Sequence, residues 1–294
     1  VIIALLRFFV VGVYTVPSTS ISMAPTLFPA AEGGDAIVLA NLLARTPARG
    51  EIWIFRRGRQ IYVKRVMGLP GERIEVRDGD LFLDGKRLVK ERSFLDRVKV
   101  PLPGLDSIWP GYPRPDGAFE RLDKGRVRDV VFSARIHAQS LPASVMVKIN
   151  NHVVLIGPKG FASSNGVEIA SGLRFGLMRN PVELWITNAD GVFRVEIDGK
   201  EVARTQIRTL AGQAVVEVVT DGEVDVKDLL LARDLRYGPV ENFTWTLAED
   251  EIFVLGDNSA NSADSRRSGP VKVDALLGRV WAVAWPPSRI RRVR

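Results

Sequence analysis

The chain of 294 residues has no cysteine and only two histidines, His137 and His152. The absence of cysteine excludes disulfides, thiol nucleophiles, iron–sulfur clusters and cysteine-based zinc sites. His137 alternates into a strand-like run and His152 follows a turn, which favours a core or surface role for both residues over a catalytic one. We therefore expect chemistry that needs neither cysteine nor histidine.

The composition, 46% hydrophobic and 26% charged, excludes a disordered or fibrous protein. The length predicts one large domain or two smaller ones. The formal net charge is +7, and nearly all of the basic excess lies on the two flanks, residues 1–91 and 249–294. This excess is either a solvated surface or an attraction to anionic lipid headgroups. No helix-turn-helix, RNP or zinc-finger pattern indicates nucleic-acid binding.

The first 13 residues, VIIALLRFFVVGV, are almost wholly apolar but fall short of the ~20 residues of a membrane-spanning helix. The run is either a buried strand or helix, or the end of a membrane anchor that begins upstream of Val1. A cleaved signal peptide is disfavoured, because the run lacks a basic start and no small-residue cleavage site follows it. We interpret residues 1–16 as the end of an N-terminal membrane anchor.

Beyond Gly34, short apolar and β-branched runs between turn residues predict a mainly β protein. The first series comprises 36–39, 51–55, 61–67, 73–76 and 81–83. Asp78-Gly79 predicts a hairpin between the last two runs. Residues from about 94 to 129 are rich in Pro, Gly and Asp, and predict an irregular loop.

A second series of runs has a spacing typical of a sandwich or jelly roll. It comprises 130–138, 145–149, 182–187, 193–197, 215–219 and 224–232. A strand at 251–255, a polar loop and an apolar run at 276–285 complete the chain.

Three short segments carry candidate chemistry: STSISMAPTL at 18–27, YVKRV at 62–66 followed by LPGE at 69–72, and GDNSANSADSR at 256–266. A serine can be activated by a lysine in place of histidine. The lysine must then be neutral, so its pKa must fall from ~10.4 toward the working pH, and burial has that effect. On a strand, Tyr62, Lys64 and Val66 share one face that burial would desolvate, whereas Arg65 points the other way and needs a partner elsewhere.

These three segments, in this order, resemble bacterial type I signal peptidases, a family of serine proteases with a Ser–Lys dyad. The resemblance covers roughly residues 5–90 and 249–286. Ser22 to Leu27 matches the family's Ser-Met-x-Pro-Thr-Leu hallmark, Lys64 and Arg65 match its Lys-Arg motif, and residues 256–266 match its Gly-Asp-Asn…Ser-x-Asp-Ser-Arg motif.

The resemblance implies the roles of the site residues. Ser22 would be the nucleophile and Lys64 the general base. Ser20 would place its hydroxyl in the oxyanion hole beside the Ser22 N–H, with Ser18 as the weaker alternative. Ser262 would hydrogen-bond and orient Lys64. Supporting residues would be Asp264, paired with Arg266 or Arg65; Gly256 and Asp257, shaping the adjoining turn; and Met23 and Pro25, in the apolar substrate groove.

The resemblance also implies an organisation. An antiparallel β catalytic domain would comprise residues 17–92 and 241–294, the latter with a basic tail. A β-sandwich accessory domain, jelly-roll-like and with an unknown partner, would be inserted at 93–240 behind a Pro/Gly-rich lead-in.

The implied activity is that of a membrane-bound serine endopeptidase that removes N-terminal signal peptides from secreted preproteins through an acyl-enzyme. Small residues would stand at the first and third positions before the cut. The partners would be preproteins and membrane lipid, and no metal or organic cofactor would be needed. The enzyme would lie at the cell (inner) membrane on a single- or few-pass anchor, with its catalytic domain on the extracytoplasmic side.

Two rival functions remain. A self-cleaving repressor-type Ser–Lys protease is disfavoured by the apolar N-terminus and by the absence of a DNA-binding helical module. A catalytically inactive relative that binds partners through the sandwich is disfavoured by the presence of Ser22, Lys64 and Ser262.

Overall fold

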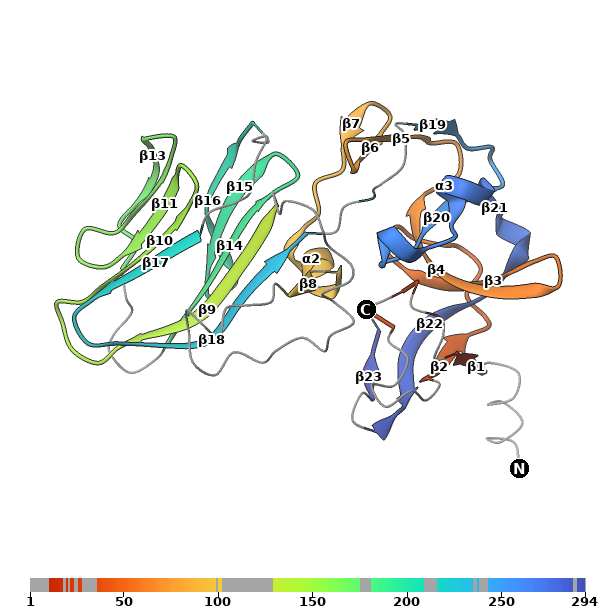
Figure 1. The fold of residues 1–294 in the computed structure, drawn as a ribbon, viewed down its shortest axis with the longest axis horizontal. Helices are drawn as coiled ribbons and strands as arrows, with labels where there is room; N and C mark the ends of the chain where they lie inside the picture. Colours follow the sequence, from red (N-terminus) through yellow and green to blue (C-terminus); the bar gives the residue numbers. More distant parts are fainter. Residues whose placement is uncertain are drawn as a thin grey trace. The chain divides into compact units, whose positions relative to one another are not determined.

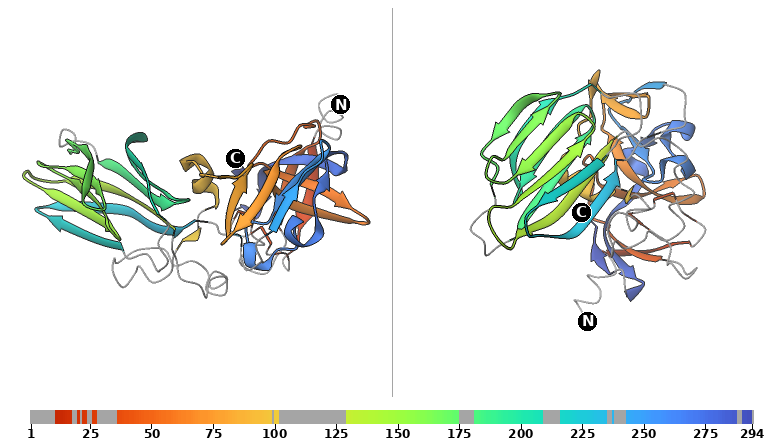
Figure 2. Two further views of the ribbon diagram at one scale, coloured as in Figure 1. Left: turned by 90° about the horizontal axis from the view of Figure 1, so that it is seen from above. Right: turned by 60° about the vertical axis from the view of Figure 1, so that its left-hand side comes forward.

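A computed structural model describes residues 11–17, 20, 22–23, 26–27, 36–98, 100–101, 129–174, 181–208, 216–234, 237, 243–287 and 290–293. The chain forms two compact units, one of Val1–Val98 and Leu235–Arg294, the other of Lys99–Asp234. Figures 1 and 2 show strands throughout both units, with helices confined to short segments of the described residues. The mainly β class that the sequence predicts is confirmed.

The first unit contains an eight-stranded antiparallel sheet in the order β1-β2-β22-β3-β4-β20-β21, with β23 paired to β22. Its strands are β1 (Val11–Val16), β2 (Ala36–Asn41), β3 (Ile52–Arg57), β4 (Gln60–Gly68), β20 (Glu251–Leu255), β21 (Val271–Lys272), β22 (Leu276–Trp285) and β23 (Arg291–Arg292). The sheet therefore joins strands from both flanks of the sequence.

A four-stranded sheet in the order β19-β5-β6-β7 completes the first unit. Its strands are β5 (Arg73–Arg77), β6 (Asp80–Leu83), β7 (Lys86–Arg87) and β19 (Phe243–Thr246). Asp78 and Gly79, with φ of 51° and 86°, join β5 to β6. Two successive positive φ values are what an Asp-Gly hairpin turn requires, so the hairpin predicted there is confirmed.

The sequence predicts that residues 11–16 belong to the end of a membrane anchor. They instead form strand β1, which pairs with β2 along its whole length. Three valines and a threonine stand in this strand, where β-branched side chains pack well. Residues 1–10 lie outside the described residues. Within the described part of the chain, no helix is both long and apolar enough to cross a bilayer.

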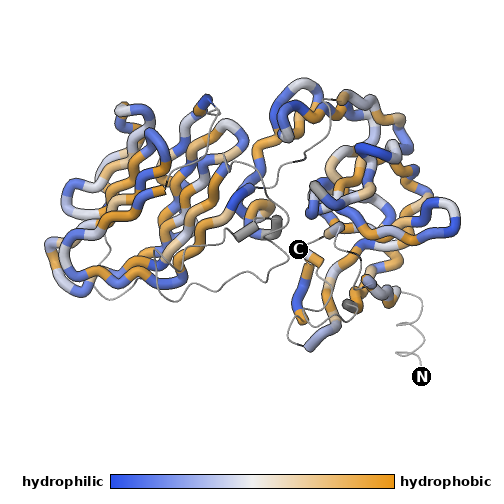
Figure 3. Tube along the Cα trace, viewed as in Figure 1, coloured by the Kyte–Doolittle hydropathy of each residue, from blue (hydrophilic) through white to orange (hydrophobic). Residues whose placement is uncertain are grey.

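The second unit is a sandwich of two antiparallel sheets, in the orders β13-β12-β11-β10-β17 and β16-β15-β14-β9-β18-β8. One large apolar cluster takes side chains from both sheets, among them Phe132, Val147, Ile156 and Ile186. Figure 3 shows apolar residues recurring along these strands and polar residues at the turns between them. Both histidines lie here, and His152 stacks on Phe193 with ring centres 4.6 Å apart and hydrogen-bonds Ser164.

The sandwich contains six strands at which the sequence predicts apolar runs and five further strands that it does not predict. The former are β9 (Val130–Ala138), β10 (Ser144–Ile149), β14 (Val182–Ala189), β15 (Val192–Ile197), β17 (Val216–Asp221) and β18 (Val224–Arg233). The latter are β8 (Val100–Pro101), β11 (His152–Ile156), β12 (Phe161–Ser164), β13 (Val167–Ser171) and β16 (Lys200–Gln206).

The start of the segment predicted to be an irregular loop is instead helix α2 (Arg92–Val98). Arg92 and Asp96 form an i,i+4 ion pair at 3.6 Å, and Leu95 is fully buried. One i,i+4 ion pair and one buried apolar residue are too weak a helical pattern to be recognised in the sequence next to a Pro- and Gly-rich stretch. Residues 102–128 lie outside the described part of the chain.

Candidate active site

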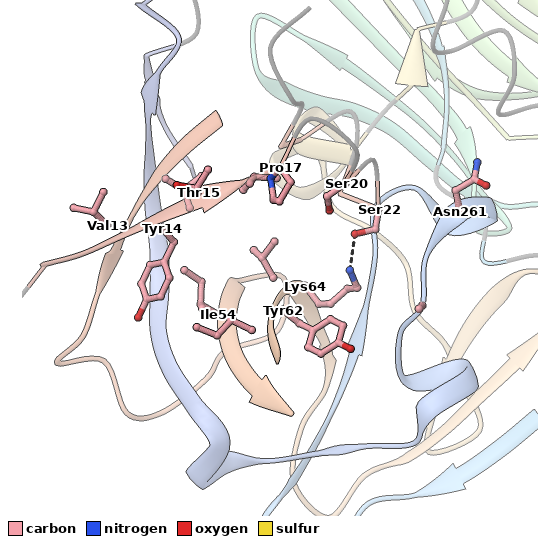
Figure 4. A pocket seen from close by; sticks show the side chains of 15 residues that line it. Val13, Tyr14, Thr15, Pro17, Ser20, Ser22, Ile54, Tyr62, Lys64 and Asn261 are labelled. Atoms are coloured by element: carbon pink, nitrogen blue, oxygen red, sulfur yellow. Dashed lines mark hydrogen bonds between the residues drawn. The ribbon is translucent and has the colours of Figure 1, made fainter. Parts of the chain in front are cut away.

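Ser22 and Lys64 meet although 42 residues separate them in the sequence. Ser22 lies in the turn that follows β1, and Lys64 lies on β4, which pairs with β3 and β20 in the middle of the eight-stranded sheet. Lys64 Nζ donates a hydrogen bond of 2.6 Å to Ser22 Oγ. Figure 4 shows the two side chains pointing at each other in one pocket.

Burial lowers the pKa of Lys64, as a lysine that acts as a base requires. The side chain is only 4% exposed, and desolvation lowers the pKa of Lys64 from 10.5 to about 8. The nearby carboxylates Asp264 and Asp257 act against this shift, and Arg266 acts with it. A substantial fraction of the amine is therefore neutral near pH 8, and a neutral amine can accept the proton of the Ser22 hydroxyl.

The pocket that holds this pair has a volume of about 580 Å³ and is largely apolar. Its walls come mainly from β1 with Pro17 (Val13, Tyr14, Thr15, Val16) and from β4 (Ile61, Tyr62, Val63, Lys64), with Val38 and Ile54 beside them. Ser20 and Ser22 both line it, and Ser20 N–H donates to Pro17 O at 2.8 Å. Ser20 thus lies beside Ser22, whereas Ser18 is outside the described residues.

Met23 does not line this pocket, contrary to the groove position that the resemblance implies. It is 1% exposed and packs in the core with Leu27, Val38 and Ile54. The reason is local: Leu27 N–H donates to Met23 O at 2.8 Å, which closes a turn whose two apolar side chains go into the core. Pro25, the other groove residue, lies outside the described part of the chain.

Arg65 finds its partner in Asp257. Its Nε and Nη2 donate to the two carboxylate oxygens at 2.8 and 2.6 Å, and both side chains are fully buried. Burial would lower the pKa of Arg65, but the Asp257 charge and hydrogen bonds outweigh it and the net direction is upward. Arg65 also donates to Gly50 O and, at 3.4 Å, to Thr26 Oγ1 near the end of the Ser22 turn.

Asp264 pairs with Arg266 and not with Arg65, which resolves the two pairings left open by the sequence. Arg266 Nε and Nη2 lie 2.9 and 2.8 Å from the two Asp264 oxygens. Asp264 also accepts from Arg266 N–H at the start of α3 (Ser265–Ser268) and from Gly256 N–H at 3.0 Å. One carboxylate thereby ties the end of β20 to the polar loop that follows it.

Gly256 allows the polar loop to approach the Ser22 turn closely. A Cβ at this position would overlap both Ser262 Oγ and the Ser22 carbonyl oxygen. The Ser22 carbonyl in turn accepts from Asn258 N–H at 3.0 Å. Asn258 belongs to the Gly-Asp-Asn motif, and the motif alone does not predict this backbone hydrogen bond to the Ser22 turn.

Ser262 does not make the hydrogen bond to Lys64 that the resemblance implies. It is 3% exposed, and its hydroxyl has no hydrogen-bond partner among the described residues. Its hydroxyl lies instead where a Gly256 side chain would be. In the described ranges, no group of three His, Cys, Asp or Glu residues is arranged to hold a metal ion.

Comparisons with known proteins agree with these motifs. The model of the family described as signal peptidase, peptidase S26, matches residues 1–108 and 187–285. A probable signal peptidase I-1 of Synechocystis sp. is 35% identical over 117 residues, which cover 36% of this chain and 56% of that protein. A probable thylakoidal processing peptidase 2 of Arabidopsis thaliana is 36% identical over 74 residues, covering 24% and 20% of the two chains.

The chain thus spans between about a fifth and just over half of these two relatives. Among solved structures, a signal peptidase I of Enterococcus faecalis V583 is 17% identical, with a TM-score of 0.27, over 80% of this chain and 96% of that one. The assignment rests on the family model, which matches well over half of the sequence. The chain belongs to the signal peptidase family, peptidase S26.

Proposed function

We propose that this protein is a serine endopeptidase that removes N-terminal signal peptides from exported preproteins, with Ser22 as nucleophile and Lys64 as general base. The observation that carries the proposal is the 2.6 Å contact between Lys64 Nζ and Ser22 Oγ in a pocket that lowers the pKa of Lys64 to about 8. The family and its relatives, a signal peptidase and a processing peptidase by name, supply the substrate class.

In the acylation step, Ser22 Oγ attacks the scissile carbonyl carbon and its proton passes to the neutral Lys64 amine. The oxyanion that forms would be held by the Ser22 N–H and the Ser20 hydroxyl, and one such donor is typically worth ~3 kcal/mol in the transition state. Lys64 then protonates the departing amine of the mature protein, which breaks the peptide bond and leaves the signal peptide esterified to Ser22.

Deacylation repeats the chemistry with water. Lys64, neutral again, takes a proton from a water molecule that attacks the ester carbonyl, and then returns that proton to Ser22 Oγ as the signal peptide leaves. The proposal places this enzyme at the extracytoplasmic face of the cell (inner) membrane, where preproteins emerge. The basic flanks of the chain, which carry most of the +7 charge, suit an anionic lipid surface.

The function is tested by incubating the full chain in detergent with a signal-peptide-bearing preprotein. A single cut at the start of the mature sequence, identified by N-terminal sequencing of the product and unaffected by EDTA, is the expected result. Binding of the preprotein without any cut would favour an inactive relative. Cleavage of this chain itself, with the preprotein left intact, would favour a self-cleaving protease; either outcome overturns the proposal.

The pH dependence of cleavage should show one acid limb with a midpoint near pH 8. Below this pH, Lys64 is protonated and cannot accept the Ser22 proton, so kcat/KM should fall about tenfold per pH unit. The measurement is kcat/KM from pH 6 to 10 on a peptide substrate without ionisable side chains, with near-UV circular dichroism as the folding control. A profile flat across this range would rule out a lysine base.

A further inference from the structure

The chain leaves the first unit through α2, next to Arg65. Helix α2 ends at Val98, and the second unit begins at Lys99. Leu95 of this helix is fully buried, and Phe94 packs against an apolar cluster of the first unit that includes Met67 and Phe253. The helix is therefore fixed in the catalytic unit immediately before the insertion begins.

The returning chain is fixed in the same cluster. Tyr237, three residues after the second unit ends at Asp234, is 1% exposed and belongs to the cluster that Phe94 packs against. Its N–H donates to Gly79 O at 2.8 Å. Both flanks of the insertion are thus anchored in one apolar cluster.

Phe94 is the aromatic neighbour of that guanidinium. The central guanidinium carbon of Arg65 lies 5.5 Å from the centre of the Phe94 ring, and Arg65 is 0% exposed. An aromatic face in this position attracts the cation and keeps water from it, most strongly where both are desolvated. Removal of the ring would leave Arg65 less firmly held on the two oxygens of Asp257.

The position of Arg65 has a consequence for Lys64, its neighbour in the sequence. The charged groups that act on Lys64 are Asp264 and Asp257, which favour its ammonium form, and Arg266, which disfavours it. The charge of Asp257 is compensated by its two hydrogen bonds from Arg65. If those bonds loosen, more of the Asp257 charge acts on Lys64 and stabilises its protonated form.

We propose that Phe94, at the point where the chain departs for the sandwich, is a positioning residue of the catalytic pair: it holds Arg65 on Asp257 and thereby controls the charge that surrounds Lys64. The inference rests on the proposed function, because it takes Lys64 to be the general base. The contacts of Arg65 with Phe94 and Asp257 do not depend on that function. The inference also gives the insertion point a role, because a displacement of α2 would act on Lys64 through the contact of Phe94 with Arg65.

The test replaces Phe94 by leucine, which keeps an apolar side chain but removes the ring. Lys64 is titrated directly by competitive labelling of its amine with acetic anhydride from pH 6 to 11, quantified by mass spectrometry. The midpoint should rise by about half a pH unit in Phe94→Leu. The kcat for cleavage at pH 7 should accordingly fall about threefold with KM unchanged, and should recover to the wild-type value above pH 9.5.

The matched control is Phe82→Leu. Phe82 in the four-stranded sheet of the same unit lies under Arg77, at 3.7 Å from guanidinium carbon to ring centre, with no contact to Arg65. It should leave the Lys64 midpoint unchanged. An unchanged midpoint in Phe94→Leu, a loss of kcat equal at all pH values, or an equal shift in Phe82→Leu would overturn the inference. Because the labelling needs no substrate, it gives an answer even if the protein cleaves no preprotein.

Discussion

Ser22→Ala is expected to lower kcat/KM for preprotein cleavage by about 10⁴-fold or more, and Lys64→Met by a similar factor. The two side chains form one hydrogen-bonded unit, and in the proposed mechanism the hydroxyl becomes a nucleophile only when the amine takes its proton. Their effects should therefore not add, and the double variant should be no slower than either single one. The measurement is single-turnover cleavage with the enzyme in excess over preprotein.

The controls for this prediction are Ser171→Ala on β13 and Lys86→Met on β7, both exposed residues outside the pocket, and neither should change the rate. Residual cleavage above a hundredth of the wild-type rate in Ser22→Ala would show that another nucleophile acts. Loss of activity in Lys86→Met would show that the assay responds to charge and not to the base.

The stability of Lys64→Met separates lost chemistry from a lost fold. The pKa of Lys64 is lower in the folded chain, about 8 against 10.5, so the folded state binds its proton less well than the unfolded state. This costs about 3 kcal/mol below pH 8, and the cost is recovered as the pH rises from 8 to 10.5. Lys64→Met should thus be more stable than the wild type at pH 7 in denaturant unfolding, and the difference should disappear near pH 10.5.

Much of the fold follows from local sequence signals. The runs at 130–138 and 276–285 coincide with β9 and β22, because β-branched and aromatic residues between polar turns determine strands locally. Positive φ values at Asp78 and Gly79 likewise occur at the Asp-Gly pair that the sequence predicts to form a hairpin turn. The motifs also single out Ser22 and Lys64, whose side chains lie 2.6 Å apart in the structure.

Partners that are far apart in the sequence could not be derived in this way. Alternation on β4 places Arg65 opposite Lys64, but it does not select Asp257, 192 residues away, over Asp264. The partner of Arg65 depends on how the loop after β20 folds back. Asp264 fixes that fold by capping the N-terminus of α3 and by accepting a hydrogen bond from Gly256 N–H. Phe94 was missed for the same reason, because nothing in its Pro- and Gly-rich surroundings points to a buried arginine.

Arg65→Met is expected to destabilise the protein by about 3–5 kcal/mol, the typical cost of removing one partner from a buried ion pair. Asp257 is 1% exposed and would lose both hydrogen bonds from Arg65, which leaves a desolvated carboxylate behind. The free energy of unfolding from urea titration at pH 7 measures this loss. The matched control is Lys272→Met, which breaks an exposed pair with Asp250 at 2.8 Å and should change stability within experimental error.

The double variant Arg65→Met/Asp257→Leu shows whether the pair supplies stability or position. Two apolar side chains of similar volume remove both buried charges, so most of the lost stability should return. Cleavage should return with it only in part. Removing the Asp257 charge eliminates an influence that raises the pKa of Lys64, so the acid limb should move below pH 8. A double variant as unstable as Arg65→Met would show that the packing around this site, and not the unpaired charge, determines the cost.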